Sequence, residues 1–204
     1  MIALKIKYLA ALNCLGLQDS VMNHSNTSIV DLKGTKIYLR ALEPEDLDLV
    51  FRIENNLDFW EVSANSAPYS RYLIKQYLEN AHRDIYEVKQ LRLVISDSTD
   101  QAIGLIDLFD FDPKNRRAAV GIVIEEESAR NKGYGKQALE LLSNYSFTHL
   151  ALHQIYAHVG ADNTASRKLF ESLGYRQAGR KKDWNFVNGS FKDELLYQLI
   201  NHVH

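Results

Sequence analysis

The pattern of hydrophobic and polar positions predicts strands and helices over most of the chain. Residues 36–42 alternate and predict a strand. The segment Glu43-Pro44-Glu45-Asp46 then predicts a helix start, because proline fits a first turn and acidic side chains suit the positive helix end. Helical spacing continues to about Asn56 and returns over residues 71–82, with a loop expected over residues 59–68.

Three strands in succession follow, over residues 91–96, 102–111 and 117–124, and their turns predict an antiparallel meander. The pattern then changes. It predicts a helix from Gly133 to about residue 149, a strand over 154–159 and a helix over 163–173. Two last strands, over 177–186 and 191–200, flank Asn188-Gly189, which is a strong hairpin signal.

Composition and charge narrow the class of protein. The 204 residues are 46% hydrophobic and 25% charged, which excludes wholesale disorder and indicates a globular domain. A net charge of −2 gives no basic footprint, so we expect no nucleic-acid partner. The single cysteine, Cys14, cannot form an internal disulfide, which favours a cytoplasmic location.

The most apolar stretch, residues 2–17, lies near the N-terminus. Its uncharged part, residues 8–17, is about half of the ~20 residues that span a bilayer, so we expect no membrane association. A short leader and a helix docked on the domain both stay open. We therefore divide the chain into an N-terminal leader or appended segment, residues 1–32, and one domain, residues 33–204.

A glycine-containing basic loop, residues 130–136, lies between an apolar strand and an amphipathic helix. A helix N-terminus presents unpaired N–H groups and partial positive charge, and glycine lets the backbone approach an anion closely. The position therefore predicts a pyrophosphate site. The spacing fits neither a Walker A loop nor a dinucleotide fingerprint.

The loop and two later features together resemble the GNAT superfamily of N-acetyltransferases. That family follows its Arg/Gln-x-x-Gly-x-Gly/Ala loop with a helix, a strand, an Asn, a second helix and Leu-Gly-Phe, and here Asn163 and Leu173-Gly174-Tyr175 stand in that order. Residues 38–47 and Val187-Asn188-Gly189 are similar to the spermidine/diamine and ribosomal-protein N-terminal acetyltransferases. The resemblance implies a mixed α+β fold with a mostly antiparallel sheet of about six or seven strands and helices on both faces.

The resemblance also implies acetyl-CoA as co-substrate and direct transfer of acetyl to a primary amine in a ternary complex. The acceptor is a polyamine-like small molecule or a protein N-terminus, with a non-catalytic acyl-CoA sensor as the other alternative and a homo-oligomer left open. The implied acetyl-CoA contacts are Ile122, Val123, Ile124, Arg130, Asn131, Lys132, Gly133, Tyr134, Gly135, Lys136, Asn163 and Ser166.

The residues that transfer protons are harder to predict from the resemblance. Polyamine acetyltransferases carry a Tyr two turns after the Asn, and here that position is Phe170, which has no proton to donate. The N-terminal branch often has a Ser one turn after the Asn, which corresponds to Ser166. Asp110 and Glu125 are candidate bases. On a regular strand Asp107 would face away from Asp110, unless a bulge intervenes.

The acceptor site is predicted from aromatic and acidic residues, namely Trp60, Tyr69, Asp107 and Asp110. The acidic pair that the polyamine branch has before its Pro-Tyr is missing, since Ser66-Ala67 precedes Pro68. We predict no metal site, because no histidine spacing resembles a zinc motif. We expect His158 to be a surface residue.

Overall fold

The computed structural model describes residues 32–63 and 67–202. The expected leader up to residue 31, with Cys14, lies outside the described residues. The strands are β1 (Ile37–Ala41), β2 (Leu91–Asp97), β3 (Ala102–Asp112), β4 (Arg117–Ile124), β5 (Gln154–Gly160), β6 (Arg176–Val187) and β7 (Ser190–Ile200). The helices are α2 (Leu47–Asn55), α3 (Leu57–Ser63), α4 (Arg71–Glu79), α5 (Ile85–Val88), α6 (Tyr134–Thr148) and α7 (Thr164–Ser172), with 3-10 turns at Pro44–Asp46 and Glu127–Ala129.

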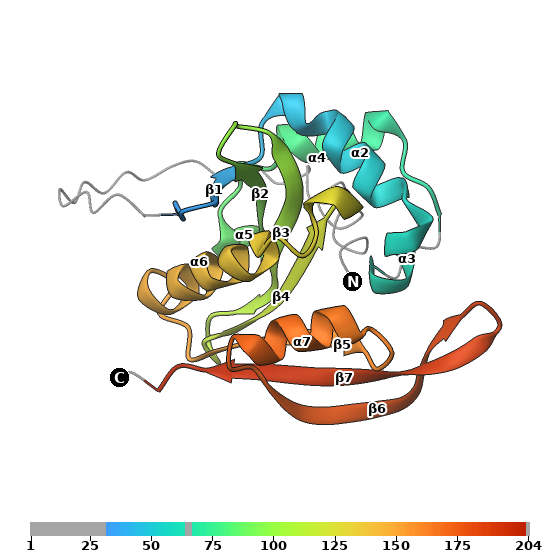
Figure 1. Ribbon diagram of the computed structural model, residues 1–204. Coiled ribbons are helices and arrows are strands. Elements are labelled where there is room, and N and C mark those ends of the chain that lie inside the picture. Colours follow the sequence, from blue (N-terminus) through green and yellow to red (C-terminus); the bar gives the residue numbers. More distant parts are fainter. Residues whose placement is uncertain (1–31, 64–66, 203–204) are drawn as a thin grey trace.

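The described strands form one seven-stranded sheet in the order β1-β2-β3-β4-β5-β7-β6 (Figure 1). Every neighbouring pair is antiparallel except β4 and β5, which run parallel. Strands β6 and β7 form the long hairpin that Asn188-Gly189 predicted, and it extends beyond α7 (Figure 1). The predicted mixed α+β fold is therefore confirmed.

Helices cover both faces of the sheet, because successive strand residues point to opposite sides. On β2, Val94 packs in one hydrophobic cluster with residues of α2 and α4. The next residue, Ile95, packs in a second cluster with residues of α6 and with Phe170 of α7. The site described below lies at the parallel strands β4 and β5, where the helices on the two faces of the sheet meet them.

Two local predictions differ from the structure. Residues 57–63 form helix α3 instead of a loop, because Asn56 is extended and its side-chain Oδ1 accepts a hydrogen bond from the Asp58 N–H at 2.9 Å, which starts a new helix. The short helix α5, capped by Asp84, was not predicted. In the described part of the chain no helix has the length and apolar character needed to cross a membrane.

Candidate functional site

The parallel strands β4 and β5 separate along their length. They pair over only three positions, from Arg117↔Gln154 to Ala119↔Tyr156. Beyond these, β4 continues against β3 as far as Gly104↔Ile124, and β5 continues against β7 as far as Gly160↔Glu194. Each strand thus keeps one partner while its other edge faces a widening gap.

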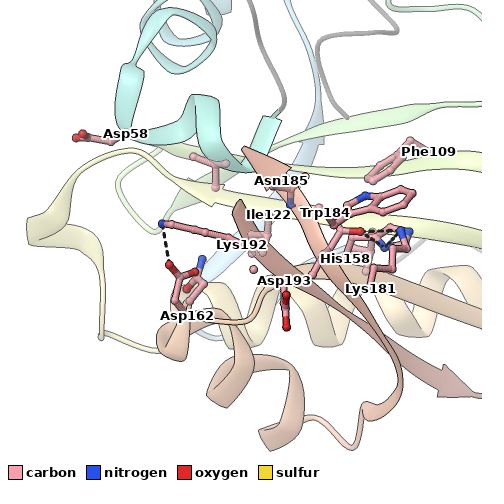
Figure 2. A pocket seen from close by; sticks show the side chains of 16 residues that line it. Asp58, Phe109, Ile122, His158, Asp162, Lys181, Trp184, Asn185, Lys192 and Asp193 are labelled. Atoms are coloured by element: carbon pink, nitrogen blue, oxygen red, sulfur yellow. Dashed lines mark hydrogen bonds and ion pairs between the residues drawn. The ribbon is translucent and has the colours of Figure 1, made fainter. Parts of the chain in front are cut away.

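A cavity of about 600 Å³ lies in this gap (Figure 2). Residues 120–123 of β4 form one wall, and His158 and Gly160 of β5 contribute to the other. Within the described part of the chain, residues 120–124 have no ladder partner on the β5 side, so their backbone groups on that edge can pair with an extended ligand arm, as an added strand would. The predicted residues Ile122, Val123 and Asn163 all line this cavity.

Close packing between β3 and β4 depends on Gly104. A Cβ built there would lie 2.2 Å from the carbonyl oxygen of Val123, far inside any real contact. Glycine is therefore required for the carbonyl of this β4 residue to lie where it does.

The predicted phosphate loop begins α6. Gly133 is the N-cap residue with φ +83°, a left-handed conformation that favours glycine, and it has no side chain to accept from the first-turn N–H groups. Asn131 is also left-handed, with φ +61°. The N–H groups of Tyr134, Gly135 and Lys136 therefore present the donor set and partial positive charge that a pyrophosphate needs. This loop fits CoA.

Two basic side chains, one from the loop and one from outside it, hold the shape of the loop. Arg130 donates to the carbonyl oxygens of Ile124 (3.3 Å) and Glu125 (3.2 Å), which joins the loop to the end of β4. The carbonyl oxygen of Lys132 accepts from Lys36 Nζ at 2.9 Å. These contacts concentrate positive charge near the start of α6 while the backbone supplies the directed donors.

The start of α7 borders the same cavity. Asn163 caps this helix, with its Oδ1 accepting from the Ser166 N–H at 3.0 Å. Ser166 is half-buried one turn into the helix. Phe170, at the position where the polyamine branch has Tyr, is buried in the core and packs edge-on against Tyr175 with ring centroids 5.0 Å apart.

Asp107 lies in a buried ion cluster. Its Oδ1 accepts from Arg92 Nε at 2.5 Å, and Glu54 Oε1 accepts from Arg92 Nη1 at 2.8 Å. All three side chains are nearly inaccessible. Burial raises the pKa of the Asp107 carboxyl, and the charge of Arg92 opposes that rise. The cluster joins α2, β2 and β3, and Asp107, which was predicted for the acceptor site, does not line the cavity.

A β-bulge determines where Asp110 lies. The β3–β4 register shifts between Phe109 and Asp112, and Asp110 has φ +50°. Phe111 consequently joins the core on the α6 face, and the charge of Asp110 acts on the pKa of Tyr156 and of His158 on β5. The structure therefore turns Asp110 toward the parallel strand pair, as only a bulge allows.

Glu125 and the predicted aromatic residues have structural partners. Arg52 of α2 contacts both carboxylate oxygens of Glu125, which ties α2 to the end of β4. Trp60 Nε1 donates to the Glu54 carbonyl oxygen at 2.9 Å. Tyr69 is buried, and burial raises its pKa. These residues build the α2–α3–α4 layer beside the cavity.

The residues of the opposite cavity wall were not predicted from the sequence. The side chains of His158, Lys181, Trp184 and Lys192 line that wall (Figure 2). Glu194 belongs to the same lining. The expectation that His158 is a surface residue is wrong, because its side chain is only 16% exposed and lies 3.0 Å from Glu194 Oε1. Strand alternation places His158 on this face, but finding Lys181 and Glu194 beside it requires the registers of β6 and β7.

A strand pair that splays beside a helix start suited to a pyrophosphate fits a transferase that uses acyl-CoA. Comparison with known proteins agrees. The family model for the acetyltransferase (GNAT) domain matches residues 36–176. Spermidine N(1)-acetyltransferase of Vibrio cholerae serotype O1 is 31% identical over 163 residues, covering 78% of this chain and 90% of the relative. The enzyme of the same name from Escherichia coli is 28% identical, covering 81% and 87%.

A solved structure extends the likeness. The spermidine N-acetyltransferase from Vibrio cholerae, in complex with CoA and spermine, superimposes with a TM-score of 0.74 at 27% identity, covering 82% of this chain and 96% of that one. The chain therefore belongs to the GNAT acetyltransferase family. It is an acyltransferase whose co-substrate is acetyl-CoA.

Proposed function

We propose that this protein transfers the acetyl group of acetyl-CoA to a primary amine of a polyamine, in the cytoplasm. The observation that carries the proposal is an acid-rich cavity placed against the splayed edge of β4. The named activity of the relatives and the spermine in the solved structure support the same acceptor class.

The charges of the cavity suit a cation. Among the described residues that line it, four contribute carboxylates, namely Asp58, Asp162, Asp193 and Glu194, and two contribute ammonium groups, namely Lys181 and Lys192. Each ammonium is neutralised locally, since Lys181 Nζ lies 2.7 Å from Glu194 Oε1 and Lys192 Nζ lies 2.7 Å from Asp162 Oδ2 (Figure 2). Asp193 is in turn paired with Arg180 at 2.5 Å, so among the described lining residues the carboxylate of Asp58 is the negative charge in excess, and it attracts a polycation. The rings of Phe109 and Trp184 offer apolar surface to the methylene segments of that polycation.

The chemistry follows from this placement. The amine nitrogen attacks the thioester carbonyl carbon, an N–C bond forms and the C–S bond breaks. Backbone N–H groups on the open edge of β4 stabilise the developing oxyanion, with the loop and Asn163 fixing the position of the co-substrate. We place Ser166 beside the leaving thiolate, where its hydroxyl passes the departing amine proton to sulfur, since Phe170 has no proton to give.

Asp110 attracts the acceptor. Its carboxylate faces the parallel strand pair from the bulge of β3, next to the cavity residue Phe109. We expect Asp110→Asn to lower kcat/KM for a triamine more than for a monoamine, because the lost charge acts on the extra positive charge of the triamine.

An acceptor panel tests the proposed function. Release of CoA thiol is measured with acetyl-CoA and spermidine, spermine, putrescine or short peptides with free N-termini, and acetylated products are weighed by mass spectrometry. We expect turnover on the polyamines. Preferred turnover on peptides supports the N-terminal alternative, which Ser166 and Phe170 favour, and contradicts the proposal. Binding of CoA with no turnover on any amine makes the protein a sensor instead.

A further inference from the structure

Three titratable side chains from adjacent strands meet on one wall of the cavity. Glu194 of β7 pairs directly with Gly160 of β5 and with Lys181 of β6. His158 is two residues before Gly160, so it points to the same face of the sheet. The result is a compact cluster, with Glu194 Oε1 3.0 Å from His158 Nδ1 and 2.7 Å from Lys181 Nζ.

The cluster assigns the tautomer of the histidine. Lys181 Nζ already donates to Glu194 at 2.7 Å and lies farther from the ring, 3.4 Å from His158 Nδ1 (Figure 2). The ring therefore carries its proton on Nδ1, where it donates to Glu194. Among the described residues Nε2 has no hydrogen-bond partner, so it keeps its lone pair on a side chain that lines the cavity.

The acceptor must lose a proton, since an alkylammonium has no lone pair with which to attack. We propose that His158 is the base that accepts this proton, with Glu194 holding the ring in the required tautomer and Lys181 facing it as a fixed positive charge. This proposal rests on the proposed function, because it concerns the amine that the same cavity binds.

Both protons that the ammonium loses have an acceptor. Nε2 takes one proton from the ammonium, leaving a neutral amine and an imidazolium. The amine then forms the N–C bond, the C–S bond breaks, and the second proton leaves the nitrogen for the thiolate. The imidazolium returns its proton to water, so the net products are the acetylated amine, CoA thiol and one proton.

The surroundings keep the imidazole ready to accept. Burial lowers its pKa, Glu194 opposes that change, Lys181 adds to it and Asp110 opposes it. The ring of Tyr156 lies edge-on at 5.6 Å. The other charged residues that line the cavity are Asp58 from α3, Asp162, Lys192 and Asp193. A neutral imidazole whose Nδ1 side is held by the Glu194 carboxylate can both accept a proton on Nε2 and hold it.

The test is the pH profile of kcat/KM for spermidine. Spermidine titrates in the same way with every variant, so differences between the pH profiles reflect the titration of groups on the enzyme. Lys181→Met removes a facing cation and should move the ascending limb to higher pH, whereas Glu194→Gln removes a facing anion and should move it to lower pH. Lys182→Met, at an exposed neighbour on β6, removes the same charge elsewhere and should leave the limb unchanged.

Substitution of the base itself completes the test. His158→Gln should lower kcat by about 10²–10⁴-fold and remove the limb. His158→Ala should recover activity with added imidazole, while both variants keep wild-type CoA affinity. Full activity in His158→Gln, or a limb lost in Asp110→Asn but kept in His158→Gln, overturns the proposal and leaves polyamine acetylation standing. A wild-type protein that acetylates no amine overturns both.

Discussion

Removing the guanidinium of Arg92 should destabilise the protein strongly. In Arg92→Met, the side chains of Glu54 and Asp107 stay buried without the cation that lies 2.8 Å and 2.5 Å from them. Removing one partner of a buried ion pair costs about 3–5 kcal/mol in the free energy of unfolding, because a buried charge is left uncompensated. For a chain of this size each kcal/mol lowers the Tm by about 2–4 °C, so we expect a loss of roughly 6–20 °C.

The loss should also depend on pH. Burial already raises the pKa of Asp107 in the folded state, and without Arg92 that pKa rises further. A carboxyl whose folded pKa lies above its unfolded pKa destabilises the fold when it is ionised, and this penalty disappears as the pH falls below the folded pKa. The deficit of Arg92→Met relative to wild type should therefore shrink on acidification from about pH 7 to about pH 5.

Urea unfolding at several pH values measures both effects. The matched control is Arg71→Met, which breaks the exposed pair between Arg71 and Asp48 on the same helix layer and should leave the free energy of unfolding nearly unchanged. If Arg92→Met loses no more stability than this control, or if its deficit is the same at all pH values, the buried cluster does not anchor α2 to the sheet.

Three further substitutions test the backbone of the site. Gly133→Ala should lower the free energy of unfolding by about 1–2 kcal/mol and raise KM for acetyl-CoA, because φ at this position is +83°. The control is Gly189→Ala, with φ +80° at the hairpin tip, which should lower the free energy of unfolding by a similar amount and leave KM unchanged. Gly104→Ala should lower the Tm and the CoA affinity measured by calorimetry, because its Cβ would lie 2.2 Å from a β4 carbonyl oxygen. The control Gly179→Ala should be tolerated, because the nearest atom to its Cβ would be 3.8 Å away. Asn163→Ala removes a helix cap, so it should cost about 1 kcal/mol in urea unfolding and weaken CoA binding in the same calorimetric assay.

Most of the fold follows from local patterns in the sequence. Alternation and helical spacing identify the strands from β2 to β7 and the helices α6 and α7. Strand β5, for example, alternates between buried and half-buried positions, and each of the two helices buries one face against the sheet. Helix α3 was missed because its start depends on the side chain of Asn56, a contact that hydrophobic periodicity does not report. Helix α5 is only four residues long, too short for a periodic signal.

The sequence predicts one part of the candidate site and not the other. The acetyl-CoA loop is contiguous, so the glycines and the helix start reveal it in the sequence. The opposite cavity wall is assembled across strands, and only the register of β5, β7 and β6 brings His158, Glu194 and Lys181 together. The orientation of Asp110 depends on a bulge with a left-handed aspartate, which strand alternation does not predict.

The protein should move acetyl from acetyl-CoA to a polyamine bound in the cavity beside β4. The most direct test is to incubate the purified protein with acetyl-CoA and spermidine and to compare the amount of acetylspermidine, found by mass spectrometry, with the amount of CoA released. We predict one acetylspermidine for each CoA, at a rate far above the hydrolysis seen without amine. Tight CoA binding with unmodified spermidine would contradict polyamine acetylation by this protein.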